Sequence, residues 1–310
     1  MLNARSCRLK TLLFLLFQCI ALMASFLFHR TASTETTPQV GTEFCTNPSV
    51  KKISFTGSTR VGKILMAQSS ETVQRVSMEL GGNACFVVFG DADLDEAVNA
   101  AVSSKFRNAG QTCVCADRFL VDAAVHDDFV SLLAEKVRSL RVGPGIDPEI
   151  QMGPLISESA VQSVSDKVKA AQEEGATLYE QGSLAEEASG PHFYPPTILT
   201  NVSVDSDIWK TETFGPVVAV RSFKTEEEAL QVANNVQVGL ASYFFTKDLA
   251  RAFSFASSLE AGMVGVNSGV LSSASTPFGG VKESGMGTEG SPLGMKEYLE
   301  TKYVFMKTSS

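Results

Sequence analysis

The sequence is poor in the residues that build metal sites and disulfide frameworks. Its three histidines, His29, His126 and His192, form no HxxxH or HxE pattern and no CxxC…H arrangement. The common zinc ligand spacings are therefore missing, and we predict no metal. Six cysteines in 310 residues are too few and too unevenly placed for a secreted disulfide scaffold, so a reducing compartment is favoured.

An excess of positive charge is also missing. The chain has 26 Lys and Arg against 34 Asp and Glu, a formal net charge of −8. This balance excludes the basic footprint of a nucleic-acid-binding protein. The composition, with 44% hydrophobic and 19% charged residues, is that of a folded soluble protein. No internal repeat or low-complexity stretch marks a flexible linker.

The first residues differ in character from the rest. Arg5, Arg8 and Lys10 precede a nearly unbroken apolar run from Leu12 to Phe28. A basic start and an apolar run are typical of a signal peptide or a short membrane anchor, although the apolar core of a signal peptide is usually shorter, about 7–15 residues. The alternative is a head that is not native to the fold behind it. We treat residues 1–32 as a separate segment and expect a membrane partner only if it is a real anchor.

From Ser33 onward, strand and helix patterns alternate, which predicts an α/β fold. Asp93 is an expected N-cap, and the apolar residues behind it repeat with a helical period, so a helix should end near Phe106. Further helices are expected at 59–69, 125–140, 157–174, 226–234 and 249–259. Strands are expected at 51–56, 73–80, 85–89, 119–121, 217–223, 242–246, 263–267 and 302–306, the last at the C-terminus, where a strand often pairs with another subunit.

The first chemical motif is a glycine-rich turn between a strand and a helix. Gly57 to Lys63 nearly matches the P-loop spacing GxxxxGK[ST], but Ile64 stands where a hydroxyl must bind magnesium. Hydrolysis of a nucleoside triphosphate is therefore disfavoured. A helix N-terminus opened by Gly57 and Ser58 still offers free amides to a phosphate or pyrophosphate. An ordinary helix cap is the alternative interpretation.

The second motif, Met78 to Ala84, places Glu79 at the end of an apolar strand and before paired glycines. Burial in such a setting would raise the pKa of Glu79, which suits a general base that works near neutral pH. The alternative is a solvated glutamate beside a turn.

The third motif, Phe106 to Cys115, places Cys113 on a small polar loop after a helix. A nucleophilic cysteine must be reachable and partly ionised, and loop amides or Arg107 could promote the thiolate. No histidine lies close in sequence, so a Cys-His hydrolase has no evident base. Cys113 as a packed thiol is the alternative.

Together, and in this order, the three motifs resemble the aldehyde dehydrogenase superfamily from about Thr37 to Phe305. The segments Glu212–Pro216 and Pro277–Gly285 match two further family blocks. Within the superfamily, Lys105–Cys115 and Gly262–Asn267 look like the succinate-semialdehyde dehydrogenases, with glutarate-semialdehyde enzymes as close relatives.

The resemblance implies an aldehyde dehydrogenase-like α/β fold. The implied parts are the remnant of a Rossmann-type, dinucleotide-binding domain over 33–80, a catalytic domain over 81–275, and a C-terminal segment over 276–310 with an oligomerisation strand. It also implies that the protein is a homo-oligomer and, for a eukaryotic source, that it is located in the mitochondrion. A cytoplasmic location, or attachment to a membrane through residues 12–28, is the alternative.

The resemblance further implies NAD or NADP as cofactor and a role for each site residue. Cys113 would attack the aldehyde to give a thiohemiacetal and then a thioester, which water activated by Glu79 would hydrolyse. Gly57 and Ser58 would meet the cofactor pyrophosphate, Glu212 the nicotinamide ribose, and Phe214 the nicotinamide.

The implied substrate is succinate semialdehyde, an intermediate of 4-aminobutyrate degradation. Arg107 would pair with its distal carboxylate, and Ser272 could add a hydrogen bond. Cys115 would form a disulfide with Cys113 and so act as a redox switch. The short Cys-x-Cys ring would be strained and easily reduced.

The chain departs from the family at its start, because members carry most of the dinucleotide-binding domain before the residue that matches Thr37. With that part go the asparagine of the oxyanion hole, the lysine that holds the adenosine ribose and the determinants of NAD or NADP preference. Two hypotheses follow: a working dehydrogenase, or a truncated, catalytically impaired chain that acts at most as an assembly partner.

Overall fold

The computed structural model describes residues 37–188 and 190–308, so the apolar run of residues 12–28 lies outside the described part. The described chain forms two compact units, one of residues up to Ile53 together with Ile64–Arg75, the other of Ser54–Lys63 and the residues from Val76 onward. The predicted boundaries at 33–80, 81–275 and 276–310 stay a prediction. No helix in the described part of the chain combines the length and the hydropathy that a membrane span requires.

The helices and strands alternate along most of the chain. The helices are α2 (Thr37–Thr46), α3 (Thr59–Ser70), α4 (Leu94–Phe106), the short 3-10 helix η1 (Arg107–Gly110), α5 (His126–Ser139), α6 (Glu158–Glu173), α7 (Asp207–Lys210), α8 (Glu226–Asn234), α9 (Leu249–Ser258) and α10 (Ser291–Lys296). The strands are β1 (Lys52–Thr56), β2 (Arg75–Glu79), β3 (Ala84–Val88), β4 (Ala116–Asp122), β5 (Thr177–Gln181), β6 (Thr197–Thr200), β7 (Val217–Phe223), β8 (Val238–Gly239), β9 (Ala241–Phe245), β10 (Met263–Val266), β11 (Val281–Lys282) and β12 (Gly285–Met286).

The smaller unit is built on α2 and the C-terminal part of α3. Cys45 of α2 is fully buried, and its sulfur accepts a hydrogen bond from the Ser69 hydroxyl at 3.5 Å. The Gln74 amide donates to the carbonyl oxygens of Phe44 and Val50 at 3.0 and 2.9 Å. These polar contacts hold the two helices and the chain after them together within this unit.

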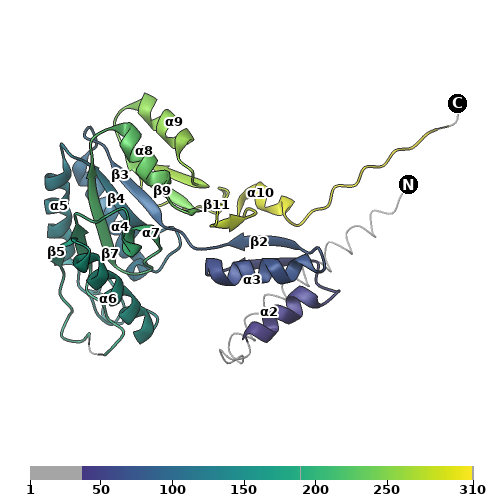
Figure 1. Cartoon of the computed structure of the whole chain (residues 1–310), viewed down its shortest axis with the longest axis horizontal. Coiled ribbons are helices and arrows are strands. Elements are labelled where there is room, and N and C mark those ends of the chain that lie inside the picture. Colours follow the sequence, from purple (N-terminus) through teal and green to yellow (C-terminus); the bar gives the residue numbers. More distant parts are fainter. Residues whose placement is uncertain (1–36, 189, 309–310) are drawn as a thin grey trace. The chain divides into compact units, whose positions relative to one another are not determined.

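The larger unit is organised by a seven-stranded sheet of order β10-β9-β3-β4-β7-β6-β5 (Figure 1). Neighbouring strands are parallel, except that β5 runs antiparallel to β6. Every residue of β3 is buried, as expected of a parallel strand covered on both faces. The Phe86 ring stacks on Phe119 of β4 and Phe245 of β9, with centroids 4.9 and 5.0 Å apart. The core therefore lies along the middle of this sheet.

The crossover helices begin where the sequence provides caps. Asp93 accepts a hydrogen bond from the Glu96 amide at 3.2 Å, and Ser157 accepts one from Ala160 at 3.2 Å, which satisfies free amides at the starts of α4 and α6. The expected ends of α4, α5, α6, α8 and α9 are confirmed within one residue. The α4 crossover joins the parallel neighbours β3 and β4, and this brings the residues before both strands to the same edge of the sheet.

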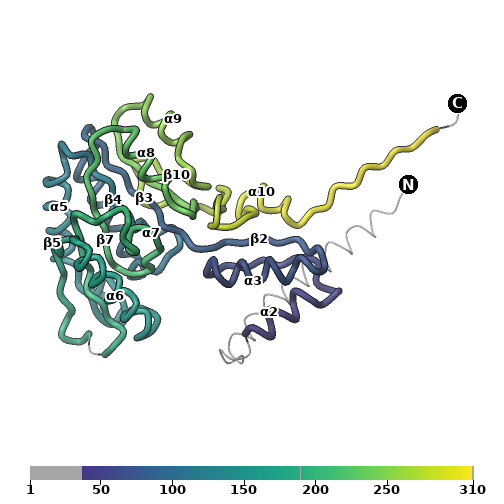
Figure 2. The backbone as a smooth tube through the Cα atoms, in the orientation of Figure 1, coloured from purple at the N-terminus to yellow at the C-terminus, as the bar shows by residue number. Residues whose placement is uncertain are grey.

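The expected strand at 302–306 is not formed. Residues 301–308 have neither helix nor strand and continue as irregular chain after α10 (Figure 2). An extended segment is stabilised as a strand only when a neighbour pairs with its backbone groups, and the single chain provides none at this place among its described residues. Tyr303 and Phe305 are accordingly 85% and 73% exposed.

Candidate active site

The Glu79 motif, the Cys113 motif and the Glu212–Pro216 segment meet at the amino ends of adjacent parallel strands. Glu79 and the paired glycines precede β3, Cys113 precedes β4, and Glu212 and Phe214 precede β7. Because β4 lies between β3 and β7 in the sheet, Cys113 is placed between the other two segments. Most open α/β folds bind ligands at the carboxyl ends of their strands, so this placement did not follow from the fold class.

Glycines allow these segments to approach closely. A side chain at Gly82 would overlap the carbonyl oxygen of Cys113, and one at Gly110 would overlap the carbonyl oxygen of Gly215. A side chain at Gly81 would come within 2.9 Å of the Glu212 carboxylate. The glycines therefore allow the three segments to form one site.

Glu79 is buried, with 4% of its surface exposed, and its Oε2 atom has no hydrogen-bond partner among the described residues. Burial, and to a lesser degree the charge of Glu289, raises the pKa of Glu79 to about 7. The predicted direction of the shift is confirmed. A carboxylate with an unpaired oxygen and this pKa can accept a proton from water at neutral pH.

Glu212 is held by contacts at both its ends. Its Oε1 atom accepts a hydrogen bond from the Gly82 amide at 3.1 Å, and its backbone carbonyl accepts one from the Lys167 ammonium at 2.8 Å. Burial, followed by the charge of Asp117, raises the pKa of Glu212 to about 7. Near neutral pH, Glu212 can therefore act as a hydrogen-bond donor or as an acceptor.

The surroundings of Cys113 in the chain by itself oppose the thiolate that loop amides or Arg107 could promote. The thiol is half-buried, and burial together with the charges of Glu212 and Glu79 raises the pKa of Cys113 above its usual value. The backbone amides of Cys113 and Val114 act in the opposite sense, but their effect is smaller. The carboxylates that oppose the thiolate lie far from Cys113 in sequence, which is why the local motif did not reveal them.

Cys115 is a free, buried thiol whose sulfur lies 3.7 Å from the carbonyl oxygens of Lys105 and Ala116. Burial raises the pKa of Cys115 to about 12. This thiol is therefore protonated and packed at neutral pH.

Gly57 and Ser58 lie directly before α3, as predicted. The Gly57 amide donates to the Glu79 carbonyl at 3.0 Å, which ties this turn to the strand that carries Glu79. Ser58 is exposed, and its hydroxyl accepts a bond from the Val61 amide at 3.4 Å. Ser58 is thus an ordinary cap at a helix N-terminus that also faces solvent. The neighbouring Lys63 forms an exposed ion pair with Glu283 at 2.8 Å.

The remaining predicted residues are exposed. The Phe214 ring is 43% exposed, and its backbone has a positive φ of 49°, a left-handed conformation that is unusual for a residue with a bulky side chain. Burial raises the pKa of Tyr243, and the charge of Arg107 opposes this shift, which places Arg107 near Tyr243. The Tyr243 hydroxyl donates to the carbonyl of Val114 at 2.6 Å. Arg107 therefore belongs to the surroundings of Cys113. Nothing in the described part of the chain brings Ser272 into contact with Arg107.

Several buried polar atoms at this edge have no partner. Thr112 Oγ1 and Asn83 Oδ1 share this property with Glu79 Oε2, within the described residues. Buried polar groups are normally paired, so such a concentration around one thiol points to a site that binds further polar groups. No local sequence pattern marks Asn83, Thr112 or the distant Glu289, since their relevance arises only from their position in the fold.

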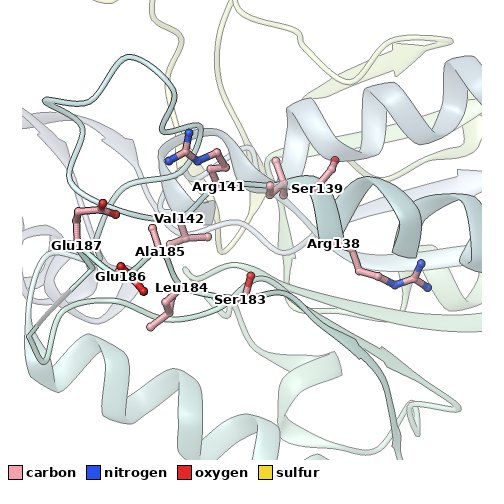
Figure 3. Close-up of a pocket in the computed structure, with 10 residues that line it drawn as sticks. Arg138, Ser139, Arg141, Val142, Ser183, Leu184, Ala185, Glu186 and Glu187 are labelled. Carbon is pink, nitrogen blue, oxygen red and sulfur yellow. The ribbon is translucent and has the colours of Figure 1, made fainter.

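One surface cavity lies away from these strand ends. It has a volume of about 320 Å³ and lies between the end of α5 and the chain after β5 (Figure 3). Arg138 at its rim is paired with Glu180, and Arg141 lies 3.7 Å from Asp147. None of the predicted site residues lines this cavity. We therefore locate the candidate site by its chemistry, at the strand ends.

Comparison with known proteins matches this arrangement to one family. The aldehyde dehydrogenase family model matches residues 31–304. The chain belongs to the aldehyde dehydrogenase family. Membership agrees with the order of the motifs and with the α/β sheet that supports them.

Two similar members of the family are named for the same substrate. The mitochondrial succinate-semialdehyde dehydrogenase of Mus musculus is 52% identical over 267 residues, which are 86% of this chain and 51% of that protein. The NADP(+) succinate-semialdehyde dehydrogenase of Escherichia coli is 48% identical and matches 86% of this chain and 55% of that protein.

The crystal structure of succinate-semialdehyde dehydrogenase from Burkholderia pseudomallei superimposes with a TM-score of 0.82 at 48% identity. The match covers 84% of this chain and 54% of that one. This aldehyde dehydrogenase chain thus spans about half the length of the relatives that it matches.

Proposed function

We propose that this chain is the catalytic part of a dehydrogenase that oxidises succinate semialdehyde to succinate with NAD or NADP. The observation that carries the proposal is the meeting of Cys113, Glu79 and Glu212 at the amino ends of three adjacent strands. A nucleophile and a base with a pKa of about 7 are the protein groups that oxidation through a thioester requires, besides a hydride acceptor. The Glu212 carboxyl group can position that acceptor.

The residues at this edge fit the nicotinamide end of a dinucleotide. Glu212 can hydrogen-bond a ribose hydroxyl, and the exposed ring of Phe214 can pack on a flat heterocycle. The N-terminal end of α3, next to the exposed Ser58, suits a pyrophosphate, although the Gly57 amide is already bonded to the Glu79 carbonyl. When bound, the cofactor supplies the hydride acceptor.

Cys113 performs the first step. Its thiolate attacks the aldehyde carbon to form a thiohemiacetal, and the Cys113 backbone amide donates to the resulting oxyanion. The thiol has to lose its proton first, and in the chain alone Glu212 and Glu79 oppose this. Protonation of either carboxyl group therefore favours the thiolate.

Glu79 performs the second step. After the hydride has left, Cys113 carries the acyl group as a thioester, and the ionised Glu79 takes a proton from the attacking water. Its unpaired Oε2 atom is available for that water. Hydrolysis then releases the carboxylic acid and returns Cys113 as a thiol.

Arg107 gives the site its preference for an aldehyde with a distal carboxylate. It is exposed, lies near Tyr243 and follows α4 directly, so its guanidinium can pair with an anionic substrate that enters toward Cys113. Ser272 is proposed to add a hydrogen bond to the same carboxylate.

The mouse relative is named as mitochondrial, and we propose the same compartment and a homo-oligomer for this chain.

The proposal is tested by turnover of the full chain, purified under reductant. Formation of the reduced nicotinamide is followed with succinate semialdehyde and either NAD or NADP, and Cys113→Ala is the control. Turnover that is lost in the control supports the proposal. A folded chain with a reactive Cys113 and no turnover would instead identify a catalytically impaired member that acts as an assembly partner.

Oxidation of Cys113 is expected to be more fully reversible when Cys115 is present, because a sulfenic acid without a partner thiol is oxidised further to a sulfinic acid that dithiothreitol does not reduce. Peroxide converts the Cys113 thiolate to a sulfenic acid, and Cys115 then displaces water from it to give a disulfide. We expect dithiothreitol to restore alkylation of Cys113 in the parent chain and to restore much less in Cys115→Ala, as measured by mass spectrometry of the Cys113 peptide. Equal recovery in both chains would contradict a switch at Cys115.

A further inference from the structure

A fully buried ion pair, Lys105 with Asp117, flanks the segment that carries Cys113. The Lys105 ammonium is 2.6 Å from Oδ1 of Asp117, and the two side chains are 0% and 2% exposed. No step of the proposed reaction uses either group. Desolvation makes a buried ion pair expensive, and an apolar pair of similar volume is often as stable. Stability alone therefore does not account for this pair.

The pair joins the two ends of the segment that carries Cys113. Lys105 lies in the last turn of α4, and Asp117 is the second residue of β4. Between them, Asn108, Ala109 and Gly110 have positive φ angles of 53°, 54° and 75°. Such a run of left-handed residues persists only when its surroundings fix it. The ion pair closes this strained segment into a loop.

Asp117 also reaches the third site segment. Its Oδ2 atom accepts a hydrogen bond from the backbone amide of Thr213 at 3.3 Å. Thr213 stands between Glu212 and Phe214, and the latter has the left-handed backbone described above. The carbonyl of Gly215 packs against Gly110 on the loop of Cys113. One carboxylate thus bonds the nucleophile segment through Lys105 and the Glu212 segment through Thr213.

We propose that Asp117, held by Lys105, is a positioning residue that fixes the Glu212–Phe214 segment against the loop of Cys113. In this role its two oxygens set where the Glu212 carboxylate stands relative to the thiol. The inference rests on the proposed function for the meaning of that geometry, but the geometry itself can be measured without turnover. Neither Lys105 nor Asp117 contacts the reacting atoms in this proposal.

The test measures how strongly Glu212 acts on Cys113. The rate of Cys113 alkylation by iodoacetamide is followed against pH in the full chain, by mass spectrometry of the Cys113 peptide. Glu212 and Glu79 are the carboxylates whose charges raise the thiol pKa. Removing one of these charges, in Glu212→Gln, is expected to speed alkylation at pH 7 by about threefold, the equivalent of half a pKa unit.

The same comparison is then made in two backgrounds without the buried charges. The first background, Lys105→Met with Asp117→Leu, keeps the side-chain volume but removes the oxygen that accepts the Thr213 hydrogen bond. In this background, the increase in the Cys113 alkylation rate caused by Glu212→Gln should fall to less than about half of that in the parent. Lys105→Met with Asp117→Asn retains an oxygen that can accept the Thr213 bond, and this background should recover the parent effect. The control background, Arg138→Met with Glu180→Leu, removes an ion pair between α5 and β5, away from the site. In this background, the effect of Glu212→Gln on Cys113 alkylation should equal that in the parent.

Two results would overturn the proposal. The first is an unchanged effect of Glu212→Gln in the folded Leu background, which would make the pair purely structural. The second is an equal loss of the Glu212→Gln effect in the Leu and Asn backgrounds, which would assign that effect to the charges of Lys105 and Asp117 and not to the Thr213 hydrogen bond. Emission of Trp209, the single tryptophan, reports whether each background is folded. Failure of succinate semialdehyde turnover would refute the proposed function and leave these alkylation results unaffected.

Discussion

Glu79→Gln is expected to leave Cys113 acylated. An activated ester such as p-nitrophenyl acetate acylates a reactive thiol without a cofactor, so the parent chain should show a burst of nitrophenolate followed by steady turnover. The variant should retain the burst and lose about a hundredfold or more of the steady rate, the size of a general-base contribution. The acetylated Cys113 peptide should accumulate in the variant and be found by mass spectrometry.

The pH dependence provides an independent check of the same prediction. A general base acts in its ionised form, and the pKa of Glu79 is about 7. The steady rate of the parent chain should therefore rise as the pH increases through about 7 and then level off. In Glu79→Gln this rise should disappear. Cys113→Ala is the matched control, because it should lose the burst as well as the steady rate.

An opposite result would reassign the base. If Glu79→Gln kept both the steady rate and its rise near pH 7, Glu212 would be the better candidate, since its pKa is also about 7. The two carboxyl groups are distinguished by their contacts. Glu212 already accepts a bond from Gly82, whereas the Oε2 atom of Glu79 has no partner among the described residues.

Local patterns predicted much of the fold. The helical period behind Asp93 predicted α4 up to its end at Phe106, because both the cap and the buried face are encoded within that one segment. Strands β5 and β6 were missed, since β5 is largely exposed and β6 has only four residues. The segment at 302–306 has the apolar pattern of a strand but lacks a pairing neighbour in the single chain. Pairing is a property of two segments and cannot be read from one.

In the candidate site, too, local features were predictable from the sequence and effects of distant segments were not. The identity of Cys113 and Glu79 as candidates was evident from their motifs, and the raised pKa of Glu79 followed from its apolar strand. Loop amides or Arg107 were expected to be able to promote the Cys113 thiolate, yet the pKa of Cys113 is raised. Burial is the largest cause of the rise, followed by the charge of Glu212. Glu212 comes from a segment about a hundred residues later in the chain, which only the order of the strands brings close.

Arg118 is the side chain whose loss should destabilise the larger unit most clearly. It is fully buried in β4, where its guanidinium donates to the carbonyl oxygens of Asn83, Val232 and Ala233 at 3.1, 3.1 and 3.0 Å. Arg118→Met should lower the free energy of unfolding by about 3–5 kcal/mol, because buried carbonyl groups then lose charged donors that nothing replaces. Chemical denaturation followed by Trp209 emission measures this loss.

Arg221→Met is the matched control for that experiment. The guanidinium carbons of Arg118 and Arg221 each lie 5.8 Å from the centre of the Trp209 ring, so either substitution removes one cation beside the fluorophore. Arg221, however, donates only to the Val202 carbonyl, at 3.3 Å, and its Nε atom is unpaired among the described residues. Its loss should cost about 1 kcal/mol or less. Equal destabilisation by the two variants would show that the cations act through the tryptophan ring, and that the three carbonyl bonds of Arg118 contribute little to stability.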